Sequence, residues 1–271
     1  MRAHVFVACL ALSLAACATS PTDPEDRADF EAQNDPAEPT NRAIFEANTF
    51  LDRNAIKPAA EAYRDNLPDD VRSAIHSFLT NLGEPFVALN DMLQGKPRRG
   101  SDALGRFMLN TMMGGAGFFD VARDMGLPHH DSDFGQTFGV WGIGEGPFVE
   151  MPLLGPSNTR DAVGFAVGLV TDPLFWMSGT AVTAAQFSRG GVDAIDERAE
   201  YLQFTDTIDK TALDPYAQYR SMYRQRRAAQ IEKGRAPDGP TGSPVDQNAP
   251  AGPSDDNKLR IIESDKQTSR R

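Results

Sequence analysis

The chain has 271 residues, and its 38 acidic side chains outnumber its 27 lysines and arginines, giving a formal net charge of −11. This balance argues against a nucleic-acid partner, because nucleic-acid binding requires a concentrated basic surface. It also excludes bulk attraction to anionic lipid headgroups as the main means of membrane binding.

The first residues have the order of a secretory signal peptide: an early arginine, an apolar run from Val5 to Ala15 and a small-residue cleavage site. That site, Leu14-Ala15-Ala16-Cys17, resembles the bacterial lipoprotein signal (lipobox). We therefore predict that residues 1–16 are removed and that Cys17 is acylated as the mature N-terminus. An ordinary signal peptide with an incidental cysteine is the alternative. Because Cys9 lies in the removed part, no disulfide is expected.

The two ends of the mature chain differ in composition from its middle. Residues 17–34 are acidic and contain proline, which predicts a flexible tether. Residues 231–271 become rich in proline, glycine and polar residues, and such a tail cannot bury enough apolar area to offset its ordering entropy. A folded domain is therefore expected over residues 35–230, followed by a disordered tail.

The middle of the chain has helical periodicity. Apolar residues recur at the i, i+3, i+4 spacing of one buried face after Asp69, from Val71 to Leu82, and a further stripe runs from Phe86 to Leu93. Capping residues mark helix starts at Asp35 (or a turn later, at Pro39), Ser101, Asn158 and Asp214. Period-2 runs of β-branched residues are nearly absent. The expected fold class is all-α, with one long irregular insert.

That insert, Asp133 to Pro156, has a glycine or proline every few residues between Phe134, Phe138, Trp141, Ile143 and Phe148. Loops of this length are usually functional or disordered, and the aromatic content argues against disorder. The insert is expected either to pack into the core or to face something apolar.

Catalytic and metal-binding patterns are weak. The glycines at 142, 144 and 146 follow no βαβ strand and have no lysine for phosphate, so they do not indicate a nucleotide site. His129 and His130 are adjacent in a loop and should point apart, without the third spaced ligand that zinc usually needs. His76 is expected to be solvated. We predict a protein that is not an enzyme and that has no cofactor or bound metal.

Two segments are amphipathic enough to contact a membrane or a partner. Ala162 to Phe187 contains one charge, Asp172, and the proline after it should break the segment into two half-length helices that lie in one leaflet or in the core. Near the end of the domain, a basic and aromatic helix face predicts either a solvated surface or a contact with phosphate headgroups or an acidic partner. Its candidate contact residues are Arg220, Arg224 and Arg227.

Short motifs, in order from about residue 35 to 227, resemble the MlaA (VacJ) family of outer-membrane lipoproteins. They include Asp35-Pro36, Asn41-Arg42, Phe45, Asn81-Leu82, Glu84-Pro85, Arg106-Phe107, Asp133-Phe134-Gly135-Gln136-Thr137, Trp141-Gly142, Arg160-Asp161 and Asp214-Pro215-Tyr216. The resemblance implies a ring-like bundle of helices in the periplasmic leaflet of the outer membrane, anchored by lipid and crossed by an amphipathic channel.

The same resemblance implies the function and the partners. Family members remove mislocalised phospholipid from the outer leaflet, beside a trimeric outer-membrane porin, and pass it to a periplasmic phospholipid carrier (MlaC-like), which maintains lipid asymmetry. A phospholipid path needs polar groups for the head and apolar groups for the tails. The candidate path or gate residues are Asn41, Phe45, Phe134, Phe138, Trp141 and Phe148. A non-transporting envelope scaffold lipoprotein is the alternative.

Overall fold

The structure, a computed structural model, describes residues 34–177 and 180–238. The predicted signal peptide, Cys17, nearly all of the predicted tether and the tail from residue 239 lie outside the described residues.

The first half of the described chain consists of helices joined by turns. Its elements are α3 (Glu38–Leu51), the π-helical turn η1 (Asp52–Ile56), α4 (Lys57–Asn66), α5 (Asp69–Leu93), α6 (Pro97–Met112) and α7 (Val121–Asp124). The second half adds a short hairpin to the helices. Its elements are α8 (Phe134–Val140), β1 (Phe148–Met151), β2 (Gly155–Asn158), α9 (Thr159–Thr171), α10 (Pro173–Trp176), α11 (Thr180–Thr211) and α12 (Pro215–Arg235).

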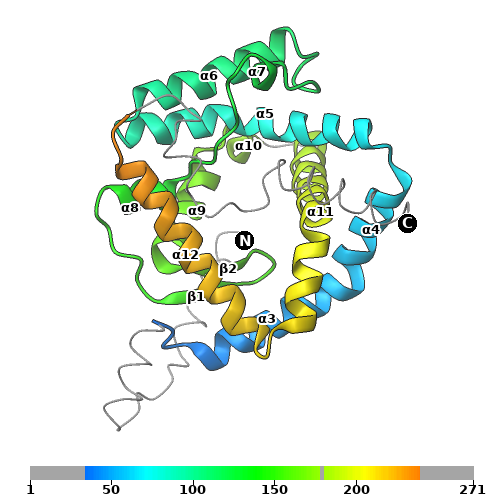
Figure 1. Cartoon of the computed structure of the whole chain (residues 1–271), viewed down its shortest axis with the longest axis vertical. Helices are drawn as coiled ribbons and strands as arrows, with labels where there is room; N and C mark the ends of the chain where they lie inside the picture. Colours follow the sequence, from blue (N-terminus) through cyan, green and yellow to red (C-terminus); the bar gives the residue numbers. More distant parts are fainter. Residues whose placement is uncertain (1–33, 178–179, 239–271) are drawn as a thin grey trace, which may run out of the picture.

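The helices are arranged as a ring (Figure 1). In this view α5 forms the upper side, α4 and α3 follow the right and lower edges, and α12 crosses the left side, while α11 lies inside the right edge. Helix α6 packs along α5, α11 packs on α4, and α8 packs between α9 and α12. The prediction of an all-α, ring-like bundle is confirmed.

Local capping explains several of the helix boundaries. The Asn158 side chain accepts a hydrogen bond from Asp161 N at 2.8 Å, and α9 begins at the next residue. The Asp214 side chain accepts a hydrogen bond from Ala217 N at 3.1 Å, and α12 begins at the residue after Asp214. Both caps were expected from the sequence, because such a side chain satisfies an amide that has no partner inside the helix.

Other boundaries differ from the expectation. Helix α3 begins at Glu38 with Pro39 in its first turn, which is the later of the two predicted starts. Helix α6 begins at Pro97, four residues before Ser101, because a proline at the first helical position lacks only a donor that would be unpaired there. The two apolar stripes before Gly95 belong to one helix, α5, which contains Pro85 in its interior. Helix α12 ends at Arg235, beyond the predicted end at 230.

The interpretation of residues 133–156 as an irregular insert is wrong in part. Asp133 accepts a hydrogen bond from Gln136 N at 2.8 Å and so caps the short helix α8. The insert ends in β1 and the start of β2, which pair antiparallel with Phe148 opposite Asn158. Each strand has only four residues, and β2 contains a glycine and a proline, so the hairpin carries too little β pattern to be predicted. Contacts of β1 with α3 and of β2 with α12 stabilise it.

The apolar core is divided and small. One cluster joins α4 to α11 through Ala60, Ala199 and Leu202, with Tyr63 and Ile195 packed against it. A second cluster, Val87, Ala88 and Ala103, joins α5 to α6. Each cluster therefore lies between two neighbouring helices of the ring.

Candidate functional site

The buried side chains of this protein are mostly polar. Among the described residues, twenty polar or charged residues are buried, against twelve hydrophobic ones. Soluble domains have the opposite preference, and a buried charge is costly unless it is paired. The interior must therefore be organised by hydrogen bonds and ion pairs.

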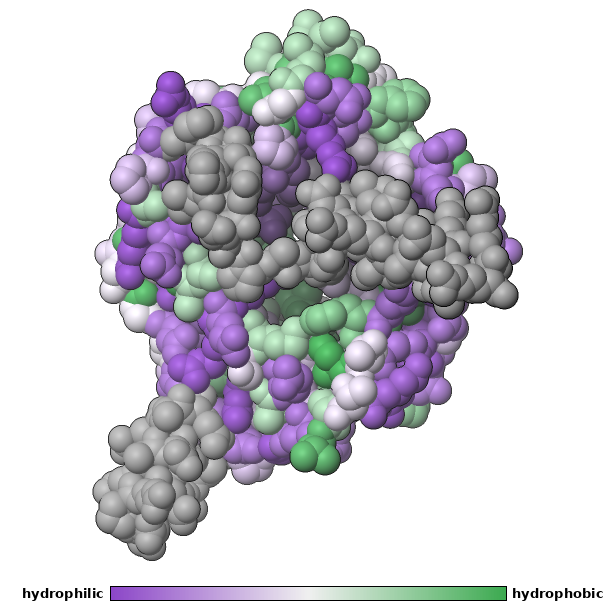
Figure 2. All heavy atoms as spheres, viewed as in Figure 1, coloured by the Kyte–Doolittle hydropathy of each residue, from purple (hydrophilic) through white to green (hydrophobic). Residues whose placement is uncertain are grey.

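Large apolar side chains lie outside instead. One patch, which we call the α6 patch, covers the outer side of α6 and the segment after it: Leu104, Met108, Met112, Met113, Phe118 and Phe119. Figure 2 shows apolar atoms gathered at the top of the molecule, where Figure 1 places α6 and α7. A second exposed set lies on α9, α10 and the residue after them: Val163, Phe165, Leu169, Val170, Phe175, Trp176 and Met177. Within residues 34–177 and 180–238, no helix is both long and apolar enough to cross a membrane.

The basic face of α12 packs against other segments of the ring and pairs with carboxylates on them. Arg220 and Arg227 keep only 9% and 16% of their side chains exposed, so the prediction of a solvated face is wrong for both. Their acidic partners belong to this chain and come from four other segments of it. The pairs are Arg220 with Asp35 (2.6 Å), Arg224 with Glu145 (2.7 Å), and Arg227 with Asp133 (2.7 Å) and Asp161 (2.6 Å).

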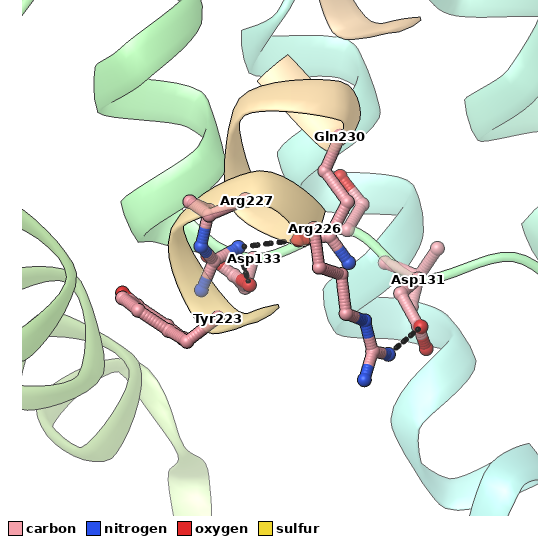
Figure 3. A pocket seen from close by; sticks show the side chains of 8 residues that line it. Asp131, Asp133, Tyr223, Arg226, Arg227 and Gln230 are labelled. Atoms are coloured by element: carbon pink, nitrogen blue, oxygen red, sulfur yellow. Dashed lines mark hydrogen bonds and ion pairs between the residues drawn. The ribbon is translucent and has the colours of Figure 1, made fainter. Parts of the chain in front are cut away.

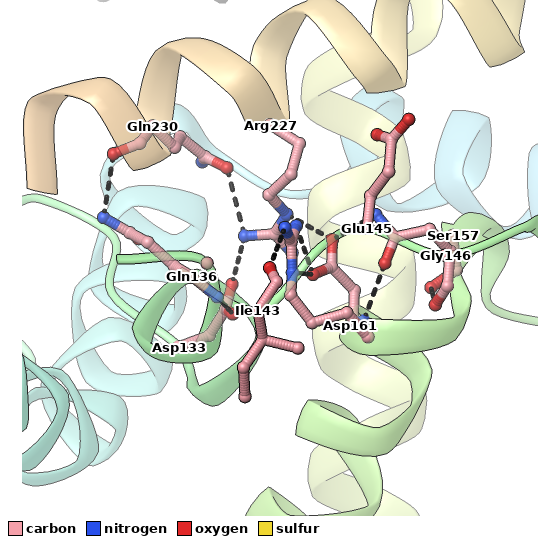
Figure 4. A network of polar contacts seen from close by, with 12 residues as sticks. Asp133, Gln136, Ile143, Glu145, Gly146, Ser157, Asp161, Arg227 and Gln230 are labelled. Atoms are coloured by element: carbon pink, nitrogen blue, oxygen red, sulfur yellow. Dashed lines mark hydrogen bonds and ion pairs between the residues drawn. The ribbon is translucent and has the colours of Figure 1, made fainter. Parts of the chain in front are cut away.

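Arg227 lies at the centre of this network (Figure 4). Burial alone would lower the pKa of its guanidinium, but the negative charges of Asp133 and Asp161 raise it above its ordinary value. Asp161 also accepts hydrogen bonds from Tyr223 and from Arg160 Nε, the latter at 2.8 Å. The network holds α12 against α8 and α9, and its charges compensate one another.

Asp35 closes a second part of the ring. It was expected to cap the first helix, but α3 begins at Glu38 and the Asp35 side chain is committed elsewhere. Asn41 Nδ2 donates to its Oδ1 at 2.7 Å, and Tyr216 and Arg220 donate to its Oδ2. The start of the described chain is thus fastened to α12.

A third network lies between α5, α6 and the segment before α8. Arg106 is buried and pairs with Glu84 and Asp120. His129 Nδ1 lies 3.1 Å from Glu84 Oε1. Burial opposes protonation of His129, but Asp131 and Glu84 outweigh it and raise the histidine pKa to about 9.

The other histidines also have carboxylate neighbours. His130 Nε2 lies 2.6 Å from Asp91 Oδ2. His76 Nδ1 lies 2.8 Å from Asp196 Oδ2, so the expectation that His76 is merely solvated is wrong. In the part of the chain that the structure describes, no group of three or more histidine, cysteine, aspartate or glutamate side chains is arranged so that it could hold a metal ion.

The predicted path residues fall into two groups. In the first, Asn41 is buried and its amide donates to Phe148 O at 3.2 Å, while the rings of Phe45 and Phe148 pack on Tyr216 at 5.6 and 6.0 Å. These contacts make Asn41 and Phe148 part of the protein's own interior. A lipid-path role for any of the three stays a prediction.

The second group is more exposed. Phe134 is buried, Phe138 is half-buried, and Trp141 keeps 55% of its surface exposed. Their rings follow one another at 6.4 and 5.8 Å, and Trp141 Nε1 donates to Leu93 O at 2.9 Å. The insert therefore packs into the core at one end and presents an aromatic side chain at the other.

A cavity of about 340 Å³ lies beside the middle of α12. Its lining is mostly charged or polar and comes from α5, α12 and the segment before α8: Val87, Asp131, Ser132, Asp133, Tyr223, Arg226, Arg227 and Gln230 (Figure 3). Arg226 and Asp131 reach toward each other at its edge, 3.4 Å apart. Such a site can bind a small group that carries charge.

Sequence reasoning did not assign the interior carboxylates to a site. Glu84, Asp35 and Asp161 lie inside the quoted motifs, and Glu84 shares the buried face of α5 with Asn81 and Asp91. Polar residues at this helical spacing were the available signal for Glu84. Asp131 and Glu145 lie in loops, where no periodicity marks them.

These features define a class: a helical ring with a charged, hydrogen-bonded interior and an apolar outer surface. The family model for the MlaA lipoprotein matches residues 33–230. The chain belongs to the MlaA lipoprotein family.

Relatives and a solved structure agree with this assignment. The chain is 34% identical, over 79% of its length and 82% of theirs, to proteins of Shigella flexneri and of Escherichia coli strain K12 named "Intermembrane phospholipid transport system lipoprotein MlaA". It is 32% identical to an uncharacterized protein of Rickettsia bellii, over 68% and 72% of the two chains. A solved structure described as "Structural basis for maintenance of bacterial outer membrane lipid asymmetry" has a TM-score of 0.64 and 33% identity, and covers 73% of this chain and 98% of its own.

Proposed function

We propose that this protein is an envelope lipoprotein that removes mislocalised phospholipid from the outer leaflet of the outer membrane and so maintains lipid asymmetry. The names of its relatives, which describe an intermembrane phospholipid transport system, support this function. The observation that carries it is the inverted distribution of side chains, with charges inside the ring and large apolar residues outside. No activated nucleophile is needed for this work.

The outer surface suits a position within one leaflet. The α6 patch and the exposed set on α9 and α10 would contact acyl chains, and burial of apolar area drives such embedding. Trp176 lies in the second set with 72% of its surface exposed, and tryptophan favours the boundary between headgroups and chains. Acylation of Cys17 would keep the protein at the membrane.

The interior suits the polar part of a phospholipid. Figure 2 shows a hollow in the middle of the molecule with polar residues above it and apolar residues below. A headgroup would follow the charged lining of α12, and the acyl chains would follow the apolar side. The expected partners are a trimeric porin beside the ring and a periplasmic carrier that receives the lipid.

The function is tested by the amount of phospholipid at the cell surface. A strain without this protein should expose more phospholipid to an added phospholipase than its parent, and the wild-type gene should restore the parent level. A non-transporting scaffold is the alternative. If the null strain and its parent expose equal amounts, the proposed function is wrong.

A further inference from the structure

The cavity beside α12 has an edge with one positive and one negative side chain that are loosely paired. The Arg226 and Asp131 side chains are 57% and 61% exposed, and their closest charged atoms are 3.4 Å apart. Exposed ion pairs of this kind contribute little to stability, because water screens them. A ligand that offers a better partner to each side chain can therefore separate them at little cost.

The other charges of the cavity are already compensated. Arg227 is held by Asp133 and Asp161, and its side chain is mostly buried. Ser132 accepts a hydrogen bond from Gln94 Nε2 at 2.8 Å, which leaves its own hydroxyl proton to donate. Within the described residues, Arg226 and Asp131 are the charged lining groups that a ligand could recruit without breaking a buried pair.

Asp131 is a fixed negative charge. A hydrogen bond with His129 lowers the pKa of the Asp131 carboxyl to about 2, although burial opposes this. Across the ring, the pKa of Glu197 on α11 is raised by burial and by the negative charges of Asp193 and Asp131, while Arg226 opposes the shift. The surroundings of Arg226 are thus rich in carboxylates, which favours a ligand that also brings a positive charge.

The size of the cavity limits what it can hold. Ligand pockets commonly have volumes of about 300–1,000 Å³. A cavity of about 340 Å³ lies at the small end of that range and suits a headgroup, but not a phospholipid with two acyl chains. The tails would have to remain outside it.

We propose that this cavity binds a zwitterionic phospholipid headgroup, with the phosphodiester on Arg226 and the ammonium group on Asp131. Binding exchanges one loose ion pair for two, because the guanidinium fork matches phosphate oxygens and the carboxylate accepts from the ammonium group. A headgroup that carries only negative charge makes the first contact, but it takes Arg226 away from Asp131 and places an additional anion beside a carboxylate that keeps only His129 as a partner among the described residues. This inference rests on the proposed function and adds a preference for phosphatidylethanolamine-like lipids over phosphatidylglycerol-like lipids.

The test titrates short-chain lipids onto the full-length, lipidated protein in detergent. The probes are dihexanoyl phosphatidylethanolamine and dihexanoyl phosphatidylglycerol, each below its micelle concentration, with phosphoethanolamine and inorganic phosphate as soluble controls. Wild-type protein should bind the zwitterionic lipid about tenfold more tightly than the anionic one, which is the equivalent of one charge-assisted hydrogen bond.

Two variants and a control locate the preference. Asp131→Asn should abolish the preference and keep binding of the anionic lipid, and Arg226→Ala should weaken binding of both lipids. Arg53→Ala is the matched control, because Arg53 is 61% exposed and lies 3.9 Å from its partner Asp209, away from the cavity lining. It should bind as wild type. Thermal unfolding of each variant shows that the fold is retained.

Equal affinity of the wild-type protein for both lipids, or a preference that persists in Asp131→Asn, would overturn the headgroup site. So would binding of phosphoethanolamine or inorganic phosphate as tightly as lipid, since the ligand would then be a free phosphate compound. If the wild-type protein only fails to prefer the zwitterionic lipid, the proposed phospholipid transport is not contradicted. If neither lipid binds and the null strain also exposes no additional phospholipid, both proposals are wrong.

Discussion

Arg220 Nη1 lies 2.6 Å from Asp35 Oδ2, and the two residues are 185 positions apart in the sequence. Both side chains are almost fully buried. This pair joins the segment before α3 to α12 and so closes the ring between the start and the end of the folded chain. We infer that this ion pair is the main contact that holds the ring closed at this point.

Breaking the Arg220–Asp35 ion pair should destabilise the protein strongly. Arg220→Ala leaves the Asp35 carboxylate buried without its charged partner, and removal of one member of a buried pair typically costs about 3–5 kcal/mol. Thermal unfolding in detergent should show a large loss. Arg64→Ala is the control, because its pair with Asp65 is exposed and should contribute little to stability. Equal losses of stability in the two variants would contradict the role of the Arg220–Asp35 pair in closing the ring.

A buried carboxyl near the hairpin should make stability depend on pH. Burial raises the pKa of Glu150 to about 7; the hydrogen bond from Asn48 opposes the shift and the charge of Asp35 adds to it. In the unfolded chain the Glu150 carboxyl has its ordinary pKa near 4.5. The stability contributed by the protonated Glu150 is therefore fully present below that pH and is lost as pH rises through 7.

Glu150→Gln removes this decline. The variant should be more stable than the wild type at pH 8, by at most about 3 kcal/mol, and similar to it at pH 4. Unfolding measured at both pH values tests this, with the exposed Glu46→Gln as control. A stabilisation that is the same at both pH values would contradict the assignment.

The charge of His129 should make stability depend on pH over a different range from that of Glu150. The pKa of His129 is raised to about 9 because Asp131 and Glu84 outweigh the effect of burial. A raised histidine pKa gives stability that is fully present below the ordinary value of 6.5 and lost as pH rises through 9. His129→Gln should therefore destabilise the protein more at pH 6 than at pH 10. A loss that does not change between these pH values would show that only the contact, and not the charge, matters.

The aromatic residues of the insert should separate stability from transport. Phe148 is 1% exposed, so Phe148→Ala should cost about 3–5 kcal/mol and lower protein abundance. Trp141 is half-exposed, and Trp141→Ala should leave abundance nearly unchanged while surface phospholipid rises, if this residue shapes the lipid path. Both quantities should be measured in the same cells. If transport in Trp141→Ala falls only in proportion to protein level, the gating prediction fails.

The helices and their caps could be predicted because their causes are local. Asn158 and Asp214 each bond an amide three residues away, and the break after Thr171 follows from Asp172-Pro173. Apolar spacing was sufficient to place α5, even though it suggested two stripes in place of one continuous helix.

The charged interior could not be predicted in the same way. Asp35 and Arg220 were each noticed, as a helix cap and as a surface cation, but nothing local indicates that they pair across 185 positions. The position of the apolar face of α6 could not be predicted either, because periodicity gives one apolar face of a helix and not the side of the protein on which that face lies. In this ring Leu104 and Met108 face outward.

The central claim is that phospholipid enters the ring. A photo-crosslinking amino acid at Tyr223, which lines the cavity, should capture phospholipid in living cells, and mass spectrometry should find the lipid adduct on that residue. The same substitution at Met112 in the α6 patch should capture membrane lipid, and at the exposed Asp65 it should capture none. Adducts at Met112 with none at Tyr223 would describe a protein that lies in the leaflet and carries nothing through its interior, which contradicts the account.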